Sequence, residues 1–258
     1  MRKWVTILKV FRCLFWRGYQ FKCPLCGNTL RKFLPGGLLH PVLKEKKIIG
    51  GGYRLNFKCP CCGSLDRDRL IYLYLLYKTE LFNKSVKLLH VAPEISLSKK
   101  FQACKNLDYL TADLYNPSVM VKMDIANIQY PDTLFDVIIC NHVLEHVVDD
   151  RKAMSELYRI LKWGGWAILQ VPLSLQLHET YEDQNITTPR ERERVFGQND
   201  HVRIYAKDYR HRLEKVGFKV EEFNWNSDER FGRLKNQFGL NKEEYIYFVS
   251  KLPTTQSF

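Results

Sequence analysis

Four cysteines lie in two near-copies of one short motif, Cys-Pro-x-Cys-Gly. The copies are Cys23-Pro24-Leu25-Cys26-Gly27 and Cys59-Pro60-Cys61-Cys62-Gly63. In each copy the two thiolates of a tight turn can point at one metal ion, and glycine tolerates the positive φ that such a turn often needs. Four sulfurs complete a tetrahedral site and leave no position for a substrate, so we expect a structural Zn²⁺. The predicted ligands are Cys23, Cys26, Cys59 and Cys62, with Cys61 as a bystander.

Two aspartates close short apolar segments further along the chain. Asp113 ends Tyr109-Leu110-Thr111-Ala112, 19 residues after Glu94, and Asp124 follows Met123. A carboxylate about 20 residues beyond the first strand-to-helix turn can accept hydrogen bonds from both hydroxyls of a ribose. The second carboxylate can accept a hydrogen bond from the amino group of adenine. These positions predict a nucleoside site.

From residue 86 onward, short apolar strands alternate with helical segments, which is typical of βαβ units and a parallel sheet. Expected strands lie at about 86–92, 107–112, 120–123, 135–140, 165–171, 217–223 and 244–250, and expected helices at about 96–104, 143–147, 150–161 and 206–216. We therefore predict a doubly wound, mostly parallel sheet of seven strands. Such a sheet binds nucleotides beyond the carboxyl ends of its strands. Asn141 and His142 follow the fourth strand and are expected at the same edge.

The chain resembles a class I S-adenosylmethionine (SAM)-dependent methyltransferase over residues 84–250. The similarity is carried by the run Phe135–His146, by Leu161-Lys162-Trp163-Gly164-Gly165, and by a first loop that reads His90-Val91-Ala92-Pro93-Glu94. That loop is typical of a subgroup with His-x-Ala-Pro-Glu in place of glycine-rich sequence. The resemblance implies a Rossmann-like methyltransferase fold with SAM as the cofactor. The cofactor contacts that it implies are His90, Ala92, Glu94, Asp113, Leu114, Asp124, Ile125, Asn141 and His142.

The run from His142 to His146 also spells His-x-x-Glu-His, a metalloprotease motif. That motif needs both histidines on one exposed face of a long helix. Here it follows a buried strand, so we do not expect a second metal site, and His146 is interpreted as a packing or hydrogen-bonding residue.

The residues that could hold an acceptor follow the fifth strand. The connection between Val171 and His201 is long for a compact domain and predicts a lid or substrate platform. His201, interpreted as paired with Asp200, is the first candidate for a general base, and His178 is the second. The expected substrate-binding residues are Tyr181, Glu182 and Arg203.

Basic residues are concentrated in the N-terminal third. The formal net charge is +12, and residues 1–80 carry all of the excess, with 16 Lys and Arg against 4 Asp and Glu. Such asymmetry suggests an anionic partner, although it also suits a solubilising surface. Residues 1–20 are expected to form a basic amphipathic helix that packs on its own protein or, alternatively, contacts a membrane surface. The longest apolar run is eight residues, against about 20 for a span, so we expect no transmembrane segment and a reduced, cytoplasmic protein.

Four parts are predicted in sequence order. They are the helix at 1–20, a zinc ribbon at 21–65, a linking helix at 66–83 and the SAM-dependent methyltransferase domain at 84–258. The leading function is methyl transfer to an O or N atom of a small-molecule or glycan-type acceptor. Two alternatives stay open: an RNA methyltransferase whose basic ribbon binds RNA, and a non-catalytic adaptor with a degenerate SAM fold.

Overall fold

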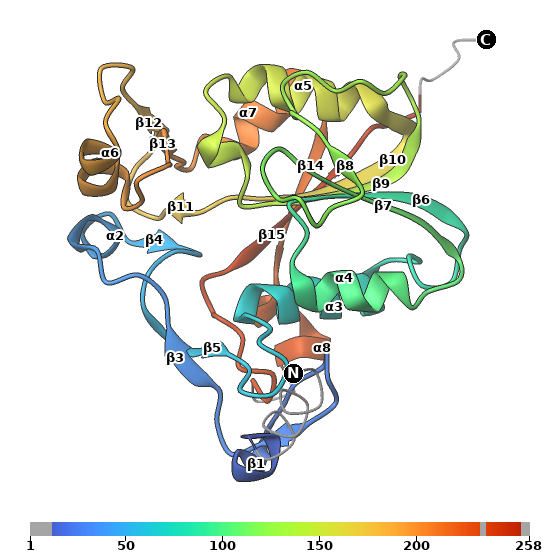
Figure 1. Cartoon of the computed structure of the whole chain (residues 1–258), viewed down its shortest axis with the longest axis vertical. Helices are drawn as coiled ribbons and strands as arrows, with labels where there is room; N and C mark the ends of the chain where they lie inside the picture. Colours follow the sequence, from blue (N-terminus) through green and yellow to red (C-terminus); the bar gives the residue numbers. More distant parts are fainter. Residues whose placement is uncertain (1–11, 233–235, 254–258) are drawn as a thin grey trace.

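The centre of the molecule is a seven-stranded sheet, seen in a computed structural model that describes residues 12–232 and 236–253 (Figure 1). From edge to edge the strands are β14 (Lys219–Asn224), β15 (Tyr245–Ser250), β10 (Leu161–Gln170), β9 (Phe135–Asn141), β6 (Val86–Val91), β7 (Leu107–Asp113) and β8 (Val121–Lys122). Within this sheet only β15 runs against its neighbours. The predicted fold class, a doubly wound and mostly parallel seven-stranded sheet, is confirmed.

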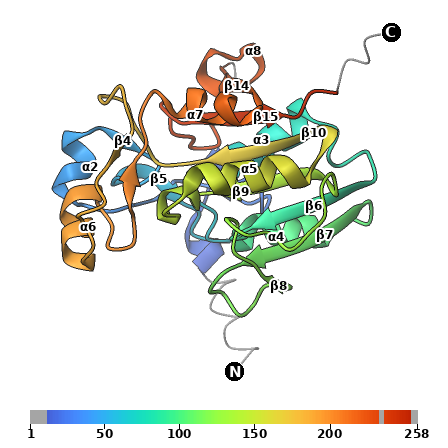
Figure 2. The same ribbon diagram turned by 90° about the horizontal axis from the view of Figure 1, so that it is seen from above.

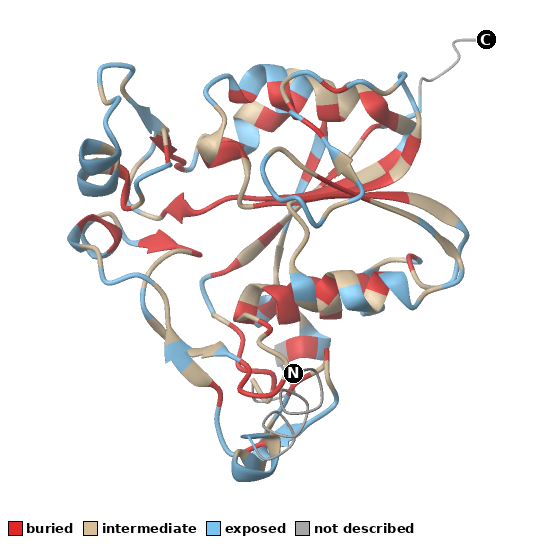
Figure 3. Cartoon of the chain, viewed as in Figure 1, coloured by how far each residue is buried: buried red, intermediate tan, exposed pale blue. Residues whose placement is uncertain are grey.

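Two hydrophobic cores lie on opposite faces of the sheet, because successive residues of a strand point to opposite sides. The helices that cover the faces are α3 (Asp66–Lys78) and α4 (Ile95–Gln102) on one side, and α5 (Asp150–Ile160) and α7 (Tyr209–Val216) on the other (Figure 1). Leu88 and Ile139 enter the first core, whereas Leu89 and Ile138 enter the second. The central strands are buried on both faces (Figure 3), which explains their nearly unbroken apolar sequences.

Three elements differ from their predicted form. Residues 144–146 form a single 3-10 turn, η1 (Leu144–His146), rather than a helix. The linking helix α3 ends at Lys78, five residues before the predicted end at residue 83. Strand β10 already begins at Leu161, because the Gly-Gly turn is accommodated as a shift of register between Leu161 and Trp166, with Gly164 at a φ of 77°.

The N-terminal third is built from two small hairpins. They pair β1 (Arg17–Lys22) with β2 (Thr29–Leu30), and β3 (Leu34–Gly36) with β5 (Arg54–Lys58). Most of the helix predicted over 1–20 lies outside the described residues; residues 12–15 are helical, but Arg17 already begins β1, so the predicted helix extends too far. Among the residues that the structure describes, no helix has the length and apolarity to cross a membrane.

The segment between the two cysteine motifs extends onto the main domain. This insert (residues 38–52) carries α2 (Pro41–Glu45) and β4 (Ile48–Ile49), and β4 pairs with β11 (Leu173–Ser174) beyond the end of β10. Helix α2 packs beside α6 (Pro189–Phe196) through Val42, Leu43 and Phe196 (Figure 2). The insert therefore packs on the main domain near the carboxyl end of β10.

A charged layer is buried where α3 meets this end of the sheet. Arg54 forms a bidentate ion pair with Asp66 at the start of α3. The nearby Glu244 is buried, and its Oε2 has no hydrogen-bond partner within the described part of the chain. Burial, and then the negative charge of Asp66, raise the pKa of Glu244 from 4.5 to about 7.

Glu244 predicts a pH dependence of stability. Between pH 4.5 and 7 the folded protein holds a proton that the unfolded chain has released, so the unfolding free energy should fall as the pH rises through this window. At about 1.4 kcal/mol per pKa unit, the loss from this group is on the order of 3 kcal/mol. Chemical denaturation at several pH values should show that Glu244→Gln removes this part of the dependence. The exposed neighbour provides the control: if Glu243→Gln has the same effect, Glu244 is not the group responsible.

Candidate active site

A cavity of about 730 Å³ opens at the carboxyl ends of β6, β7 and β9. The chain adds β7 and β8 on one side of β6 and then β9 and β10 on the other, so the cavity lies where the strand order reverses. Its volume falls within the range of about 300–1,000 Å³ that is usual for ligand sites. The predicted cofactor residues that line it are Ala92, Asp113, Leu114, Asp124, Ile125 and His142.

Asp113 and Asp124 lie at neighbouring strand ends and face this one cavity. Oδ1 of Asp113 accepts hydrogen bonds from the backbone N–H groups of Tyr115 and Asn116, at 2.7 and 2.8 Å. Oδ1 of Asp124 accepts one from Ala126 at 2.8 Å. These Asx-type turns fix both carboxylates. Their Oδ2 atoms make no hydrogen bond to the described residues and are available to a ligand.

Three predicted cofactor residues do not line the cavity but form a buried network behind its first loop. Glu94 lies between His90, whose Nε2 is 2.8 Å from Oε2, and Asn141, whose Nδ2 donates to Oε1 at 3.1 Å. The other ring nitrogen of His90 is 2.9 Å from the hydroxyl of Tyr109. In the same loop Ala92 has a φ of 46°, a left-handed conformation that L-residues other than glycine seldom adopt. Such strain is typical of ligand-binding loops.

His142 stands between the cavity and the insert. It has a φ of 55°, and its Nε2 is buried without a partner among the described residues. Burial, and then the charge of Arg67, hold the pKa of His142 well below its usual value, so the ring is neutral. A Cβ placed on Gly50 would lie only 2.8 Å from Cε1 of this ring. The glycine-rich segment of the N-terminal third therefore packs against His142, a residue that lines the cavity, and the sequence interpretation missed this contact.

Four side chains come together beside His142. Oε1 of Glu145 lies 3.9 Å from Nε2 of His146, and Nδ1 of His146 lies 3.3 Å from Oδ2 of Asp200. The rings of His146 and His201 meet edge to face, with centroids 4.7 Å apart. Asp200 therefore contacts His146 rather than its sequence neighbour His201, so the predicted Asp200–His201 pair is wrong. Adjacent residues often point in different directions, and here the turn at η1 brings His146 to Asp200.

Burial controls the charge of this cluster. It lowers the pKa of His201 to about 4, with a smaller contribution from His146. It raises the pKa of Glu145 to about 8. His146 and Asp200 line the cavity, whereas His201 is buried behind them with Nε2 held 2.8 Å from Nε2 of Gln198.

The connection after β11 carries the other predicted acceptor residues. Its elements are β12 (Tyr181–Glu182), α6, capped at its start by Thr188, and β13 (Arg203–Ile204). The guanidinium group of Arg203 is buried and donates to the carbonyl groups of Leu144, Val147 and Val148 and to Glu182. Arg203 therefore holds η1 against β13. Tyr181, Glu182 and His178 are exposed and do not line the cavity, whereas Lys152 and Arg192, which we had not predicted, do.

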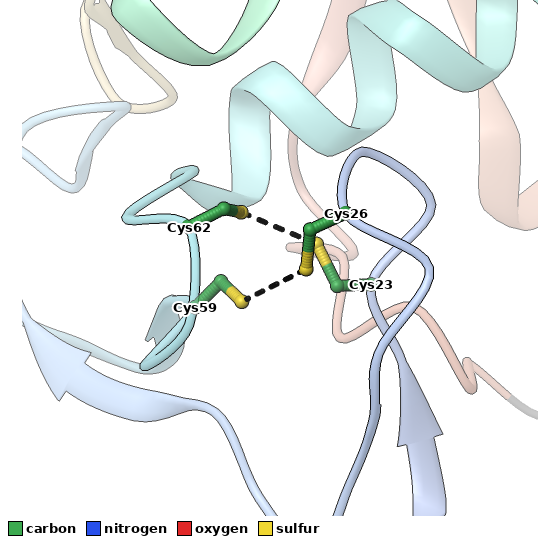
Figure 4. A group of neighbouring side chains, drawn as sticks. All are labelled: Cys23, Cys26, Cys59 and Cys62. Atoms are coloured by element: carbon green, nitrogen blue, oxygen red, sulfur yellow. Dashed lines mark hydrogen bonds between the residues drawn. The ribbon is translucent and has the colours of Figure 1, made fainter. Parts of the chain in front are cut away.

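The four predicted metal ligands meet in a separate site (Figure 4). Their sulfur atoms all lie within 4.8 Å of one another, with Cys23 to Cys62 at 3.6 Å and Cys26 to Cys59 at 3.9 Å. The two turns are equivalent, because Gly27 N–H donates to Cys23 and Gly63 N–H to Cys59, and both glycines have φ near 80°. Four converging thiols in paired turns fit a tetrahedral Zn²⁺. Cys61 is not part of this group.

Several solved structures are partly similar to this chain. A SAM-dependent methyltransferase from Archaeoglobus fulgidus shares 15% identity, with 73% of this chain and 95% of the other covered and a TM-score of 0.45. The [4+2]-cyclase SpnF shares 14% identity over 72% and 81% of the two chains, with a TM-score of 0.47. No curated protein sequence matches significantly.

The sequence itself matches a family model. The model describes a methyltransferase domain and matches residues 91–222, half of the chain. This range begins at the end of β6, contains the cavity residues of β7 to β9 and the Glu145–His201 cluster, and ends in β14. The chain therefore belongs to the methyltransferase-domain family and is a methyltransferase.

Proposed function

We propose that the chain transfers a methyl group from SAM to an oxygen or nitrogen atom of a small-molecule or glycan-type acceptor. One observation carries this proposal: two fixed carboxylates, Asp113 and Asp124, and two histidines, His142 and His146, line the same cavity. The carboxylates suit the ribose and base of an adenosine, and the imidazoles suit a nucleophile that must lose a proton.

The residues present fit the cofactor. The free oxygen of Asp113 would accept from the ribose hydroxyls and that of Asp124 from the adenine amino group, with Leu114 and Ile125 against the base. The buried Oδ1 of Asn141 and Nε2 of His142 have no partner in the described chain, and a polar methionine end would satisfy them. We propose that Glu94, held by His90 and Asn141, takes the place of glycine-rich sequence in this loop. When bound, SAM supplies a methyl group on a positively charged sulfur.

The protein would align the acceptor with that methyl group and accept its proton. The acceptor's hydroxyl or amine loses a proton, its O or N atom bonds to the methyl carbon, and the bond from that carbon to sulfur breaks. Positioning alone accounts for much of such a rate increase. His146 and Asp200 line the cavity at this end and are the residues placed to meet the acceptor.

The wall of the cavity favours a small acceptor over RNA. Apart from Asp113 and Asp124, which are assigned to the cofactor, its charged residues are Asp149, Asp200, Lys152 and Arg192, two of each sign, whereas a nucleic-acid groove is lined by basic residues. The insert packs against His142, and α6 adds Arg192 to the lining of the cavity. We further propose that Zn²⁺ bound by Cys23, Cys26, Cys59 and Cys62 holds this basic third as a zinc ribbon, so that its insert keeps its place.

Isothermal titration with S-adenosylhomocysteine (SAH) tests the cofactor assignment. We expect one binding site per chain. A protein that binds neither SAH nor SAM would instead be the non-catalytic adaptor. Addition of a mixed-sequence RNA should not change the SAH affinity, and tight RNA binding that weakens steeply with salt would favour the RNA alternative.

His201→Ala is expected to lower kcat well over tenfold and to leave SAH affinity almost unchanged. The ring of His201 holds that of His146 in place at the acceptor end of the cavity. A general base that is out of position loses much of the roughly 10²–10⁴-fold that it contributes. The measurement is single-turnover methyl transfer from labelled SAM to the acceptor, alongside SAH titration. His211→Ala on the exposed face of α7 is the matched control. Unchanged turnover in His201→Ala would remove this histidine from the reaction.

A further inference from the structure

A buried carboxylate without a hydrogen-bond partner lies behind His146, at the acceptor end of the cavity. Glu145 is 1% exposed, and neither of its side-chain oxygens makes a hydrogen bond within the described residues. Burial of a polar group without compensation is costly, and a buried carboxylate is normally paired or bound to a metal. The surroundings of Glu145 should therefore contain a group that compensates it when the protein is at work.

Two imidazoles point at this carboxylate from different parts of the chain. One ligand atom each of Glu145, His146 and His201 can be chosen so that all three lie within 4.8 Å of one another. His142 also approaches, with Nδ1 3.5 Å from Oε1 of Glu145. The histidines of the His-x-x-Glu-His run thus do not form the arrangement known from metalloproteases. Instead, a distant histidine completes the set.

The imidazole of His146 is oriented as a metal ligand usually is. Nδ1 of His146 faces the carboxylate of Asp200 at 3.3 Å, which leaves Nε2 toward Glu145 at 3.9 Å. The side-chain amide of Gln198 holds the ring of His201, with its nitrogen 2.8 Å from Nε2. If His201 binds through Nδ1, this amide must turn over so that its oxygen accepts a hydrogen bond from Nε2–H. A metal-bound histidine almost always gives its other ring nitrogen to a carboxylate or similar partner.

The backbone holds the two halves of this set together. The N–H group of Val202 donates to the carbonyl oxygen of Glu145 at 2.9 Å. Arg203 next to it donates to the carbonyl groups of Leu144, Val147 and Val148. Residues 144–148 and 201–203 are therefore fixed as one unit, and the three side chains are brought together by the fold rather than by chance contact at the surface.

We propose that Glu145, His146 and His201 bind a divalent transition-metal ion at the acceptor end of the cavity. Two imidazoles and one carboxylate suit Zn²⁺ or Fe²⁺ and leave at least one coordination position open. This second ion is separate from the Cys₄ site. Metal binding does not depend on the proposed function, but the role of the ion in the reaction does. In methyl transfer, an ion here would draw an oxygen or nitrogen donor of the acceptor toward the methyl group. With the histidine nitrogens occupied, the carboxylate of Asp200 remains to take up the acceptor's proton.

The test is the Co²⁺ content of the untagged full-length protein, measured by elemental analysis after loading and desalting. We expect roughly two equivalents in the wild type, one in each site, and one in the double variant His146→Ala/His201→Ala. Absorption from thiolate to cobalt reports the Cys₄ site alone and should stay unchanged. His211→Ala should keep both equivalents. Glu145→Gln, which preserves side-chain volume, should weaken the second site about tenfold or more in a Co²⁺ titration.

The same cobalt content in the wild type and the double variant would overturn the proposal. If the double variant does not fold, the Co²⁺ titration of Glu145→Gln decides, and an unchanged affinity would equally count against the site. SAH titration separates this inference from the proposed function. SAH binding without a second Co²⁺ removes the metal site alone, whereas a second Co²⁺ without SAH binding removes the proposed cofactor and leaves the metal site standing.

Discussion

Asp113→Ala is expected to weaken SAH binding about 100-fold while the protein remains folded. Each hydrogen bond to a charged group contributes roughly 1.5–3 kcal/mol, and one carboxylate that holds both ribose hydroxyls loses two of them on substitution. In the turn after β7, the backbone N–H groups of Tyr115 and Asn116 also lose the carboxylate oxygen to which they donate. The measurement is isothermal titration, with thermal unfolding in parallel to show that the variant remains folded despite the loss of these two turn hydrogen bonds.

The opposite end of the same strand supplies the control. Asp108 lies on β7 too, but it is exposed and forms an ion pair with Lys87. Asp108→Ala should therefore bind SAH as the wild type does. Equal affinity in Asp113→Ala and the wild type would mean that the nucleoside is held by other residues.

Cys23→Ser is expected to remove one zinc equivalent and to lower the melting temperature by about 10 °C or more. Structural Zn²⁺ supplies roughly 10–16 kcal/mol of apparent binding energy in small domains, and a change of 1 kcal/mol shifts the melting temperature of a chain of this size by about 2–4 °C. Methyl transfer should fall too. The insert between the cysteine pairs contributes β4 to the pairing with β11 and places Gly50 against His142.

Cys61→Ala is the matched control, because Cys61 is buried in the second cysteine turn but lies outside the ligand group. It should retain zinc even if it loses some packing energy. Elemental analysis and calorimetry distinguish the two variants. A full zinc content in Cys23→Ser, or its loss in Cys61→Ala, would contradict the assigned ligand set.

Features set by short stretches of sequence could be predicted. The alternation of apolar strands and helices predicted the strands of the sheet in their order along the chain, since burial on both faces leaves a clear apolar pattern. Asp113 and Asp124 could be placed because the carboxyl ends of parallel strands share one edge. The paired spacing of Cys23 and Cys26 with Cys59 and Cys62 was equally local, and the structure brings these sulfurs together.

Features that depend on distant contacts could not be predicted. Nothing local to Gly50 indicates that it lies against His142, because a strand pairing across more than 100 residues brings them together. Asp200 was assigned to His201 as its neighbour, whereas the bend at η1 gives it His146. Arg203 was predicted to bind the substrate, but its N–H groups donate to backbone carbonyl groups instead.

A crystal structure of the protein with SAH bound would test the central claim most directly. We predict that the nucleoside occupies the cavity at the ends of β6, β7 and β9, with both ribose hydroxyls on the free carboxylate oxygen of Asp113 and the adenine amino group on that of Asp124. The sulfur should face the side where His146 and Asp200 lie. A nucleoside bound elsewhere, or one in this cavity that touches neither aspartate, would contradict the account.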